Sequence, residues 1–257
     1  MAGNPSIFDL SGKVAVVTGG NRGIGLGMAR GMARAGASIS VWSRDAGKNA
    51  EAVAELDALG VSAGSVVCDV SDESSVVAAC AATIDAFGRI DIGVANAGFG
   101  DYVNPVELSL ERWRRVLSTN LDGAFLTFRE IAKHMIERGG GGKLIAVSSM
   151  VESFGAPKQP HYAASKGAIG AMVRSYAVEL ARHDIQVNSI RPGWISTEVL
   201  EPIVENEKAS KVLLGRTPAR RFGKPSDLEG IAVYLSSDAS RYHTGDSILI
   251  DGGYSIF

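Results

Sequence analysis

Short runs of β-branched and apolar residues alternate along this chain with longer stretches of helical periodicity. This alternation is the pattern of parallel strands joined by crossover helices. The runs are nearly continuously apolar, as expected of strands that helices cover on both faces. We therefore predict an α/β fold with a doubly wound parallel sheet, in one domain over residues 1–257. The predicted strands are residues 14–18, 38–42, 65–68, 92–95, 144–148, 186–190 and 247–250, and the predicted helices are residues 24–35, 46–59, 72–87, 110–138, 163–182 and 226–236.

Two segments interrupt this alternation. Residues 139–142 are four consecutive glycines, which we interpret as a flexible turn between a helix and a strand. Residues 194–221 have weak periodicity, several charges and two prolines. Long irregular segments in compact domains are often binding loops, so we predict that residues 194–221 cover the substrate. The alternative is a passive excursion over the surface.

Composition excludes several classes of partner. The 26 basic and 28 acidic residues give a net charge of −2, so no nucleic-acid or anionic membrane partner is expected. Residues 1–10 lack the features of a signal peptide, and no apolar run approaches the ~18 residues of a membrane span. Cys68 and Cys80 have no metal-site or disulfide-framework spacing. We expect a cytoplasmic protein with two buried thiols and no metal.

A glycine-rich turn follows the first predicted strand. Residues 18–25 read TGGNRGIG and lead into a predicted helix. Glycines let the backbone approach a pyrophosphate closely, and a helix N-terminus offers free N–H groups at the positive end of its dipole. The strand–turn–helix context predicts a Rossmann-type nucleotide site.

The end of the second predicted strand bears on the choice of cofactor. NAD-binding folds usually place an acidic residue there for the ribose 2′-hydroxyl, whereas arginine suits a 2′-phosphate. This chain has Ser43 and Arg44 at that place, and Arg22 lies in the glycine turn. Two guanidinium groups without a carboxylate favour NADP(H) over NAD(H). The alternative is that Arg44 is a solvated surface residue.

A serine, a tyrosine and a lysine have a spacing suited to proton transfer. Ser149 follows the strand at 144–148, and Tyr162 and Lys166 share one helix face because they are four residues apart. An ammonium group one turn away favours phenolate and lowers the tyrosine pKa towards a useful range. Asn120 falls in the apolar stripe of helix 110–138, where a structural and a catalytic asparagine are equally compatible with the pattern.

Together these motifs resemble those of the classical short-chain dehydrogenase/reductase family, over residues 13–253. The family has N-N-A-G where this chain has Ala95 followed by Asn96, Ala97 and Gly98. The resemblance implies a catalytic tetrad of Asn120, Ser149, Tyr162 and Lys166. The cofactor site that it implies, together with the residues already named, comprises Gly19, Asn21, Arg22, Gly23, Ile24, Gly25, Ser43, Arg44, Asp69, Val70, Asn96, Ala97, Gly98, Tyr162, Lys166, Pro192, Gly193, Ile195 and Thr197.

The resemblance also implies a mechanism, which is reversible hydride transfer between the nicotinamide and a carbonyl or alcohol carbon. In that mechanism Tyr162 transfers the oxygen proton and Ser149 polarises the carbonyl. Lys166 lowers the tyrosine pKa and holds the ribose hydroxyls, while Asn120 holds a water in a proton relay. Members of the family are commonly homotetramers, so we expect a homo-oligomer.

The predicted function is that of an NADP(H)-dependent oxidoreductase interconverting a secondary alcohol and a ketone, with closest likeness to sugar or sugar-acid dehydrogenases. One alternative is a 3-oxoacyl-carrier-protein reductase, which would need a basic patch beside the cleft. A second is a nucleotide-sensing scaffold without activity. Candidate residues for the basic patch are Arg112, Arg114, Arg115 and Arg129, and for an aromatic pocket wall Phe99, Tyr102, Phe154, His161 and Trp194.

Overall fold

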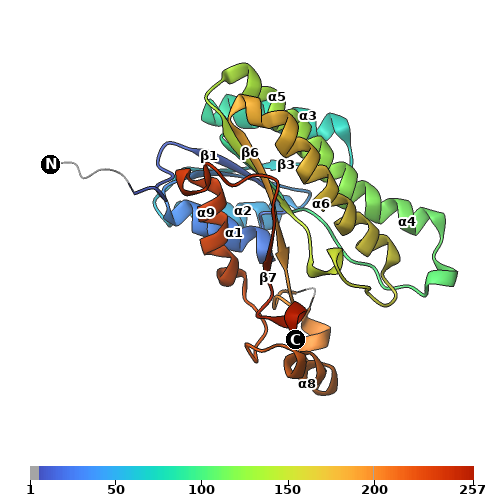
Figure 1. Cartoon of the computed structure of the whole chain (residues 1–257). Helices are drawn as coiled ribbons and strands as arrows, with labels where there is room; N and C mark the ends of the chain where they lie inside the picture. Colours follow the sequence, from blue (N-terminus) through green and yellow to red (C-terminus); the bar gives the residue numbers. More distant parts are fainter. Residues whose placement is uncertain (1–5, 199) are drawn as a thin grey trace.

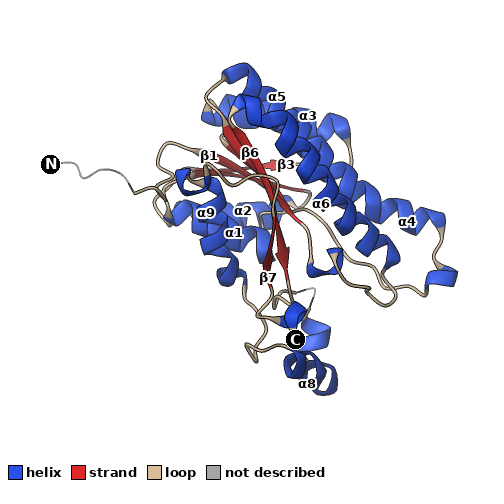
Figure 2. Ribbon diagram, in the orientation of Figure 1, coloured by secondary structure: helices blue, strands red, loops and turns tan. Residues whose placement is uncertain are grey.

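Seven parallel strands form a single sheet in the order β3-β2-β1-β4-β5-β6-β7. The computed structural model describes residues 6–198 and 200–257. Figures 1 and 2 show the sheet between two layers of helices. The chain starts in the middle of the sheet at β1, winds to one edge, and returns beside β1 at β4. This topology confirms the predicted doubly wound fold. The strands are β1 (Val14–Thr18), β2 (Ser38–Ser43), β3 (Ala63–Val67), β4 (Ile92–Ala95), β5 (Gly142–Val147), β6 (Ile185–Pro192) and β7 (Ser247–Ile250).

Each face of the sheet carries its own hydrophobic core. Side chains of β1 alternate between the faces, so Val16 joins one core, whereas Ala15 and Val17 join the other. Helices α3, α5 and α6 cover the Val16 face, and α1, α2 and α9 cover the opposite face. The helices are α1 (Gly23–Arg34), α2 (Ala46–Asp57), α3 (Glu73–Phe87), α4 (Leu110–Leu117), α5 (Gly123–Arg138), α6 (Pro160–Leu180), α7 (Glu201–Val204), α8 (Glu207–Arg216) and α9 (Glu229–Ser236).

The predicted helix over residues 110–138 is helical along its whole length, but a π-helical turn divides it. Helix α4 ends at Leu117, a π-helical turn spans Ser118–Asp122, and α5 continues to Arg138. The wider turn contains Asn120, whose buried amide bonds to the backbone of Phe99. Periodicity alone does not reveal this insertion, because the apolar stripe continues on both sides of it.

The segment 194–221 is more regular than its sequence pattern indicates. It contains the short helix α7 and the ten-residue helix α8. Asn206 caps α8 by accepting a hydrogen bond from the Ala209 backbone N–H at 3.0 Å. In Figure 1, α8 lies beyond the lower end of the sheet, near the C-terminus of the chain. Residue 199 of this segment, and residues 1–5 of the region tested for a signal peptide, lie outside the described residues.

Several element limits also differ from the prediction. Strand β3 covers Ala63–Val67, and therefore ends before Cys68. Helix α6 begins at Pro160, a residue that favours the first helical turn because it has no N–H to satisfy. Gly142, predicted to be part of a turn, opens β5. Within residues 6–198 and 200–257, no helix combines the length and apolarity needed to cross a membrane.

Lys143 is a buried cation in β5. It is 7% exposed, and its Nζ donates a hydrogen bond to Ser240 Oγ at 3.1 Å. Burial lowers its pKa to about 8, although Asp238 and Asp184 act in the opposite direction. Because the lysine of the unfolded chain keeps its ordinary pKa of about 10.5, the unfolded chain binds more protons than the folded protein between these two values. Lys143 therefore makes the free energy of unfolding rise with pH in that window.

We expect Lys143→Met to stabilise the protein most at neutral pH and progressively less at alkaline pH. Its advantage in unfolding free energy over the wild type should shrink by about 2 kcal/mol between about pH 7.5 and about pH 10. Urea unfolding followed by circular dichroism at a series of pH values measures this difference. Lys211→Met, at an exposed position of α8, is the control. Its unfolding free energy should change with pH as that of the wild type does. Parallel curves for Lys143→Met would contradict the prediction.

Candidate active site

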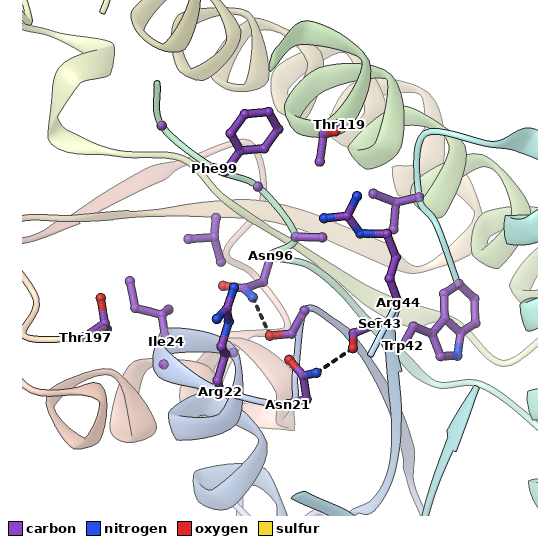
Figure 3. A pocket seen from close by; sticks show the side chains of 18 of the residues that line it. Asn21, Arg22, Ile24, Trp42, Ser43, Arg44, Asn96, Phe99, Thr119 and Thr197 are labelled. Carbon is purple, nitrogen blue, oxygen red and sulfur yellow. Dashed lines mark hydrogen bonds between the residues drawn. The ribbon is translucent and has the colours of Figure 1, made fainter. Parts of the chain in front are cut away.

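A cavity of about 840 Å³ lies beyond the carboxyl ends of the central strands. Its walls come from the residues that follow β1, β2, β4, β5 and β6, where open α/β sheets bind their ligands. Figure 3 shows the part formed by the glycine turn and the end of β2. The cavity is lined by Gly19, Asn21, Arg22, Gly23, Ile24, Gly25, Trp42, Ser43, Arg44, Asp45, Ala46, Lys48, Cys68, Asp69, Val70, Asn96, Ala97, Gly98, Phe99, Gly100, Thr119, Val147, Ser148, Ser149, Tyr162, Lys166, Pro192, Gly193, Thr197 and Glu198.

The glycine turn owes its shape to positive φ angles and to its contact with the end of β4. Gly19 and Gly23 have φ of +61° and +53°, values that side chains rarely allow. Asn96 Nδ2 donates to the carbonyl oxygens of Thr18 at 2.9 Å and Gly19 at 3.2 Å. A Cβ atom on Gly25 would collide with the Gly19 carbonyl and with Asn96 Nδ2. The backbone therefore approaches the cavity more closely than any other residue type would permit.

The end of β2 is fixed by a short hydrogen-bond chain. Asn21 Nδ2 donates to Ser43 Oγ at 2.5 Å, and that hydroxyl donates to Asn49 Oδ1 at 2.6 Å (Figure 3). Asn21 and Asn49, at the two ends of this hydrogen-bond chain, hold Ser43 in place, so the Ser43 hydroxyl already has protein partners for its hydrogen bonds. Arg44 has no comparable restraint, because its side chain is 73% exposed and its Nη1 lies 3.9 Å from Asp69 Oδ2.

Three cations and three carboxylates line the outer part of the cavity: Arg22, Arg44 and Lys48, with Asp45, Asp69 and Glu198. Arg22 and Arg44 line it as predicted, and the sequence analysis missed both Lys48 and Glu198. Glu198 Oε2 accepts hydrogen bonds from Arg22 Nη1 at 2.8 Å and from Lys48 Nζ at 3.4 Å. These bonds hold the pKa of the Glu198 carboxyl below its ordinary value. The sequence carries one signal for Lys48 as a residue of this cavity. It lies in the first turn of the helix after β2, four residues beyond Arg44.

Ser149, Tyr162 and Lys166 all line the inner wall of the same cavity. Ser149 follows β5, while Tyr162 and Lys166 lie in the first two turns of α6. Lys166 is 4% exposed, and its Nζ donates to the Val147 carbonyl at 2.7 Å and lies 5.7 Å from the Tyr162 ring centroid.

The electrostatics of this group differ from the expected pattern. Burial raises the pKa of Tyr162, and a hydrogen bond with the Ser149 hydroxyl partly opposes that rise. Burial also lowers the pKa of Lys166 to about 8. Lys166 Nζ is bonded to the Val147 carbonyl, and the predicted effect of Lys166 on the tyrosine pKa remains a prediction. Ser149 is the group that favours the phenolate here.

Asn120 and Ile195 lie behind the cavity wall. The Asn120 amide accepts from the Phe99 N–H and donates to the Phe99 carbonyl and to Ser165 Oγ, at 3.0 to 3.2 Å. Its donors are therefore occupied by protein groups, and its predicted relay role remains a prediction. Ile195 packs in a hydrophobic core and pairs with Gly223 through the backbone, so its side chain does not line the cavity. Its cofactor contact also remains a prediction.

A second chamber of about 670 Å³ is lined by the segment after Ser149, by α8 and by the C-terminal residues. Tyr102, Phe154 and Trp194 of the predicted aromatic wall line it, whereas Phe99 lines the first cavity. His161 is fully buried and lines neither. The two chambers adjoin, since Ser149 lines the first and its neighbour Met150 lines the second.

The family model described as enoyl-(acyl carrier protein) reductase matches residues 19–255. The chain belongs to the short-chain dehydrogenase/reductase family. It is 37% identical to gluconate 5-dehydrogenase of Gluconobacter oxydans, covering 98% of both chains. It is 39% identical to 2-dehydro-3-deoxy-D-gluconate 5-dehydrogenase of Escherichia coli, covering 97% of this chain and 98% of the relative.

A solved structure of gluconate 5-dehydrogenase from Burkholderia cenocepacia, in complex with NADP and tartrate, has the same fold. It superposes with a TM-score of 0.93 at 36% identity, covering 97% of this chain and 98% of that one. The first cavity described above suits such a dinucleotide. Its glycine turn leaves backbone N–H groups open to a pyrophosphate, and three cations flank the end of β2.

We expect Tyr162→Phe to fold and to bind NADP(H) as the wild type does, but to lose about 10³-fold or more in kcat. The substitution removes only the hydroxyl that faces the cavity. Tyr176→Phe is the matched control, because Tyr176 lies on the same helix and packs against Phe128, away from the cavity. Steady-state kinetics and NADPH fluorescence measure the two effects. A Tyr162→Phe variant with the kcat of the wild type would show that another group transfers the proton.

Proposed function

We propose that the protein is an NADP(H)-dependent oxidoreductase that interconverts a secondary alcohol and a ketone on a sugar acid. The observation that carries this proposal is the meeting of Ser149, Tyr162 and Lys166 at the inner wall of a dinucleotide-sized cavity. The curated relatives that act on gluconate and its dehydro derivatives support the choice of substrate class.

In the proposed mechanism the bound nicotinamide supplies the hydride acceptor or donor at the carbinol or carbonyl carbon. Ser149 donates a hydrogen bond to the substrate oxygen and orients it towards Tyr162. Tyr162 then takes up or delivers the proton on that oxygen, since the one Ser149 O–H is used by the substrate. Lys166 holds a positive charge beneath the site and has ribose hydroxyls as its proposed partners.

The carrier-protein alternative receives little support from the proposed basic patch. Arg112 donates to Asp101 through two nitrogens, at 2.8 and 2.6 Å, and Arg115 Nη2 lies 3.6 Å from the same carboxylate. Arg129 is paired with Glu73 and Glu130. Carboxylates therefore pair three of the four arginines, all but Arg114, that an acidic carrier would need. The scaffold alternative does not account for the intact group of Ser149, Tyr162 and Lys166.

The second chamber is our proposed substrate site, covered by residues 194–221 within the same domain. Arg216 lies over the Tyr254 ring, with its Cζ 4.7 Å from the ring centroid. Trp194 packs edge-on against the same ring, and among the described residues its buried Nε1–H has no hydrogen-bond partner. No ion pair involves Arg216 in residues 6–198 and 200–257. Two available donors in a mostly apolar chamber, which Gln159, Asn206 and Lys208 also line, suit a carboxylate.

We also propose that the protein is a cytoplasmic homotetramer. Large apolar side chains lie exposed on the outer faces of α5 and α6, where Phe125 is 40% and Val178 82% exposed. A further apolar group at the C-terminus comprises Ile256 and Phe257, exposed by 86% and 68%. Such patches are typical of subunit interfaces. The two buried cysteines are free, as suits a reducing compartment.

We expect Arg44→Ser to raise the KM for NADP(H) at least about tenfold and to leave the KM for NAD(H) nearly unchanged. The proposed partner of the Arg44 guanidinium is the 2′-phosphate, which NADP(H) has and NAD(H) lacks. Hydrogen bonds to charged groups contribute roughly 1.5–3 kcal/mol. Arg174→Ser, at an exposed position on α6, is the control. Equal changes for both cofactors would argue against a 2′-phosphate contact.

We expect Arg216→Met to raise the KM for 5-keto-D-gluconate about tenfold or more, with a small change in kcat. The KM for a neutral ketose should stay close to that of the wild type, because such a substrate has no carboxylate to pair. Arg216→Lys retains the charge and should recover part of the loss. If the KM for both substrates rises equally, Arg216 maintains the structure of the chamber and does not bind the substrate carboxylate.

A further inference from the structure

Three segments that are distant in the sequence meet over the outer part of the cofactor cavity. Arg22 belongs to the turn before α1, Lys48 to the first turn of α2, and Glu198 to the segment after β6. The Glu198 carboxylate bridges the other two through its Oε2 atom, at 2.8 Å from Arg22 Nη1 and 3.4 Å from Lys48 Nζ. All three side chains line the cavity.

The position of this bridge follows from contacts of the backbone nearby. A Cβ atom on Gly23 would lie 3.3 Å from Thr197 Cγ2, so the residue before Glu198 rests directly on the glycine turn. Arg44, at the end of β2, reaches into the same space from the other side of the cavity (Figure 3). Glu198 is thereby held between the glycine turn and α2, beside the arginine proposed to bind the 2′-phosphate.

Charge and chemistry make Glu198 and a 2′-phosphate competitors. Guanidinium and ammonium groups bind carboxylate and phosphate oxygens alike, and a phosphate offers three oxygens and nearly two negative charges. The bridging side chains are solvent-accessible, with Arg22 55%, Lys48 40% and Glu198 60% exposed. Exposed ion pairs contribute only about 0.2–1 kcal/mol each, so a phosphate dianion is able to displace the carboxylate.

We propose that Glu198 sets the cofactor selectivity of this protein by occupying the cations that would otherwise bind the 2′-phosphate. Arg22 and Lys48 stay paired with Glu198 when the bound nucleotide has a free 2′-hydroxyl. They exchange that carboxylate for the phosphate when NADP(H) enters. Glu198 thus weakens the binding of the phosphorylated cofactor and leaves that of NAD(H) unaffected. This inference rests on the NADP(H) use proposed above.

The test measures binding of two fragments, 2′,5′-ADP and 5′-AMP, to the full-length protein by isothermal titration calorimetry. These ligands differ only in the 2′-phosphate and require no turnover. We expect Glu198→Gln to bind 2′,5′-ADP about fivefold more tightly than the wild type, as expected for the loss of two exposed ion pairs. Binding of 5′-AMP should remain within error of the wild type.

Glu201→Gln is the matched control, since Glu201 is exposed at the start of α7, three residues further along, and does not line the cavity. It should change neither affinity. The gain of Glu198→Gln should also diminish at high ionic strength, because salt screens exposed charges. An unchanged affinity for 2′,5′-ADP, a weaker one, or equal gains for both ligands would each overturn the role of Glu198.

The same experiment separates this inference from the proposed cofactor preference. If the wild type binds 2′,5′-ADP no better than 5′-AMP, the NADP(H) preference is wrong. If Glu198→Gln then creates a preference for 2′,5′-ADP, the role of Glu198 stands. If it creates none, both proposals fail together.

Discussion

The site depends on the connection between the carboxyl ends of β1 and β4. Thr18 Oγ1 accepts hydrogen bonds from the backbone N–H groups of Asn96 and Ala97 at 3.0 Å, and Asn96 returns bonds to the Thr18 and Gly19 carbonyls. These bonds join two strands that are neighbours in the sheet and far apart in the sequence. They satisfy backbone groups at the point where the sheet order reverses, and they hold the glycine turn open towards the cavity.

The side chains at the inner end of the cavity are buried, which disfavours their charged forms. The charged side chains at the outer end are exposed to solvent. Lys166 is nearly inaccessible to solvent, so its pKa falls to about 8, and the pKa of Tyr162 rises for the same reason. Arg22, Arg44 and Lys48 remain exposed to solvent, with only weak restraint from carboxylates. The inner groups are suited to moving a proton, and the outer groups to holding an anion.

Much of this arrangement could be predicted from local patterns. The doubly wound parallel sheet follows from the alternation of apolar runs and helices, and the spacing of Tyr162 and Lys166 places both on one face of α6. The π-helical turn at Ser118–Asp122 could not be predicted in this way, because the apolar stripe continues on both sides of it and the partner of its Asn120 side chain, Phe99, lies in another segment. Lys48 and Glu198 were missed for a related reason, since an exposed charge has no local pattern that marks a partner 150 positions away.

The sequence by itself determined the fold class, the glycine turn and the placement of Tyr162 and Lys166 on one helix face, because each depends on spacing within one element or on the conformational freedom of glycine. Only the tertiary structure decided which charges face one another across the cavity, that Asn120 bonds to Phe99, and that Ile195 packs into the core. These outcomes depend on distances between segments that parallel pairing brings together, and no local periodicity encodes those distances.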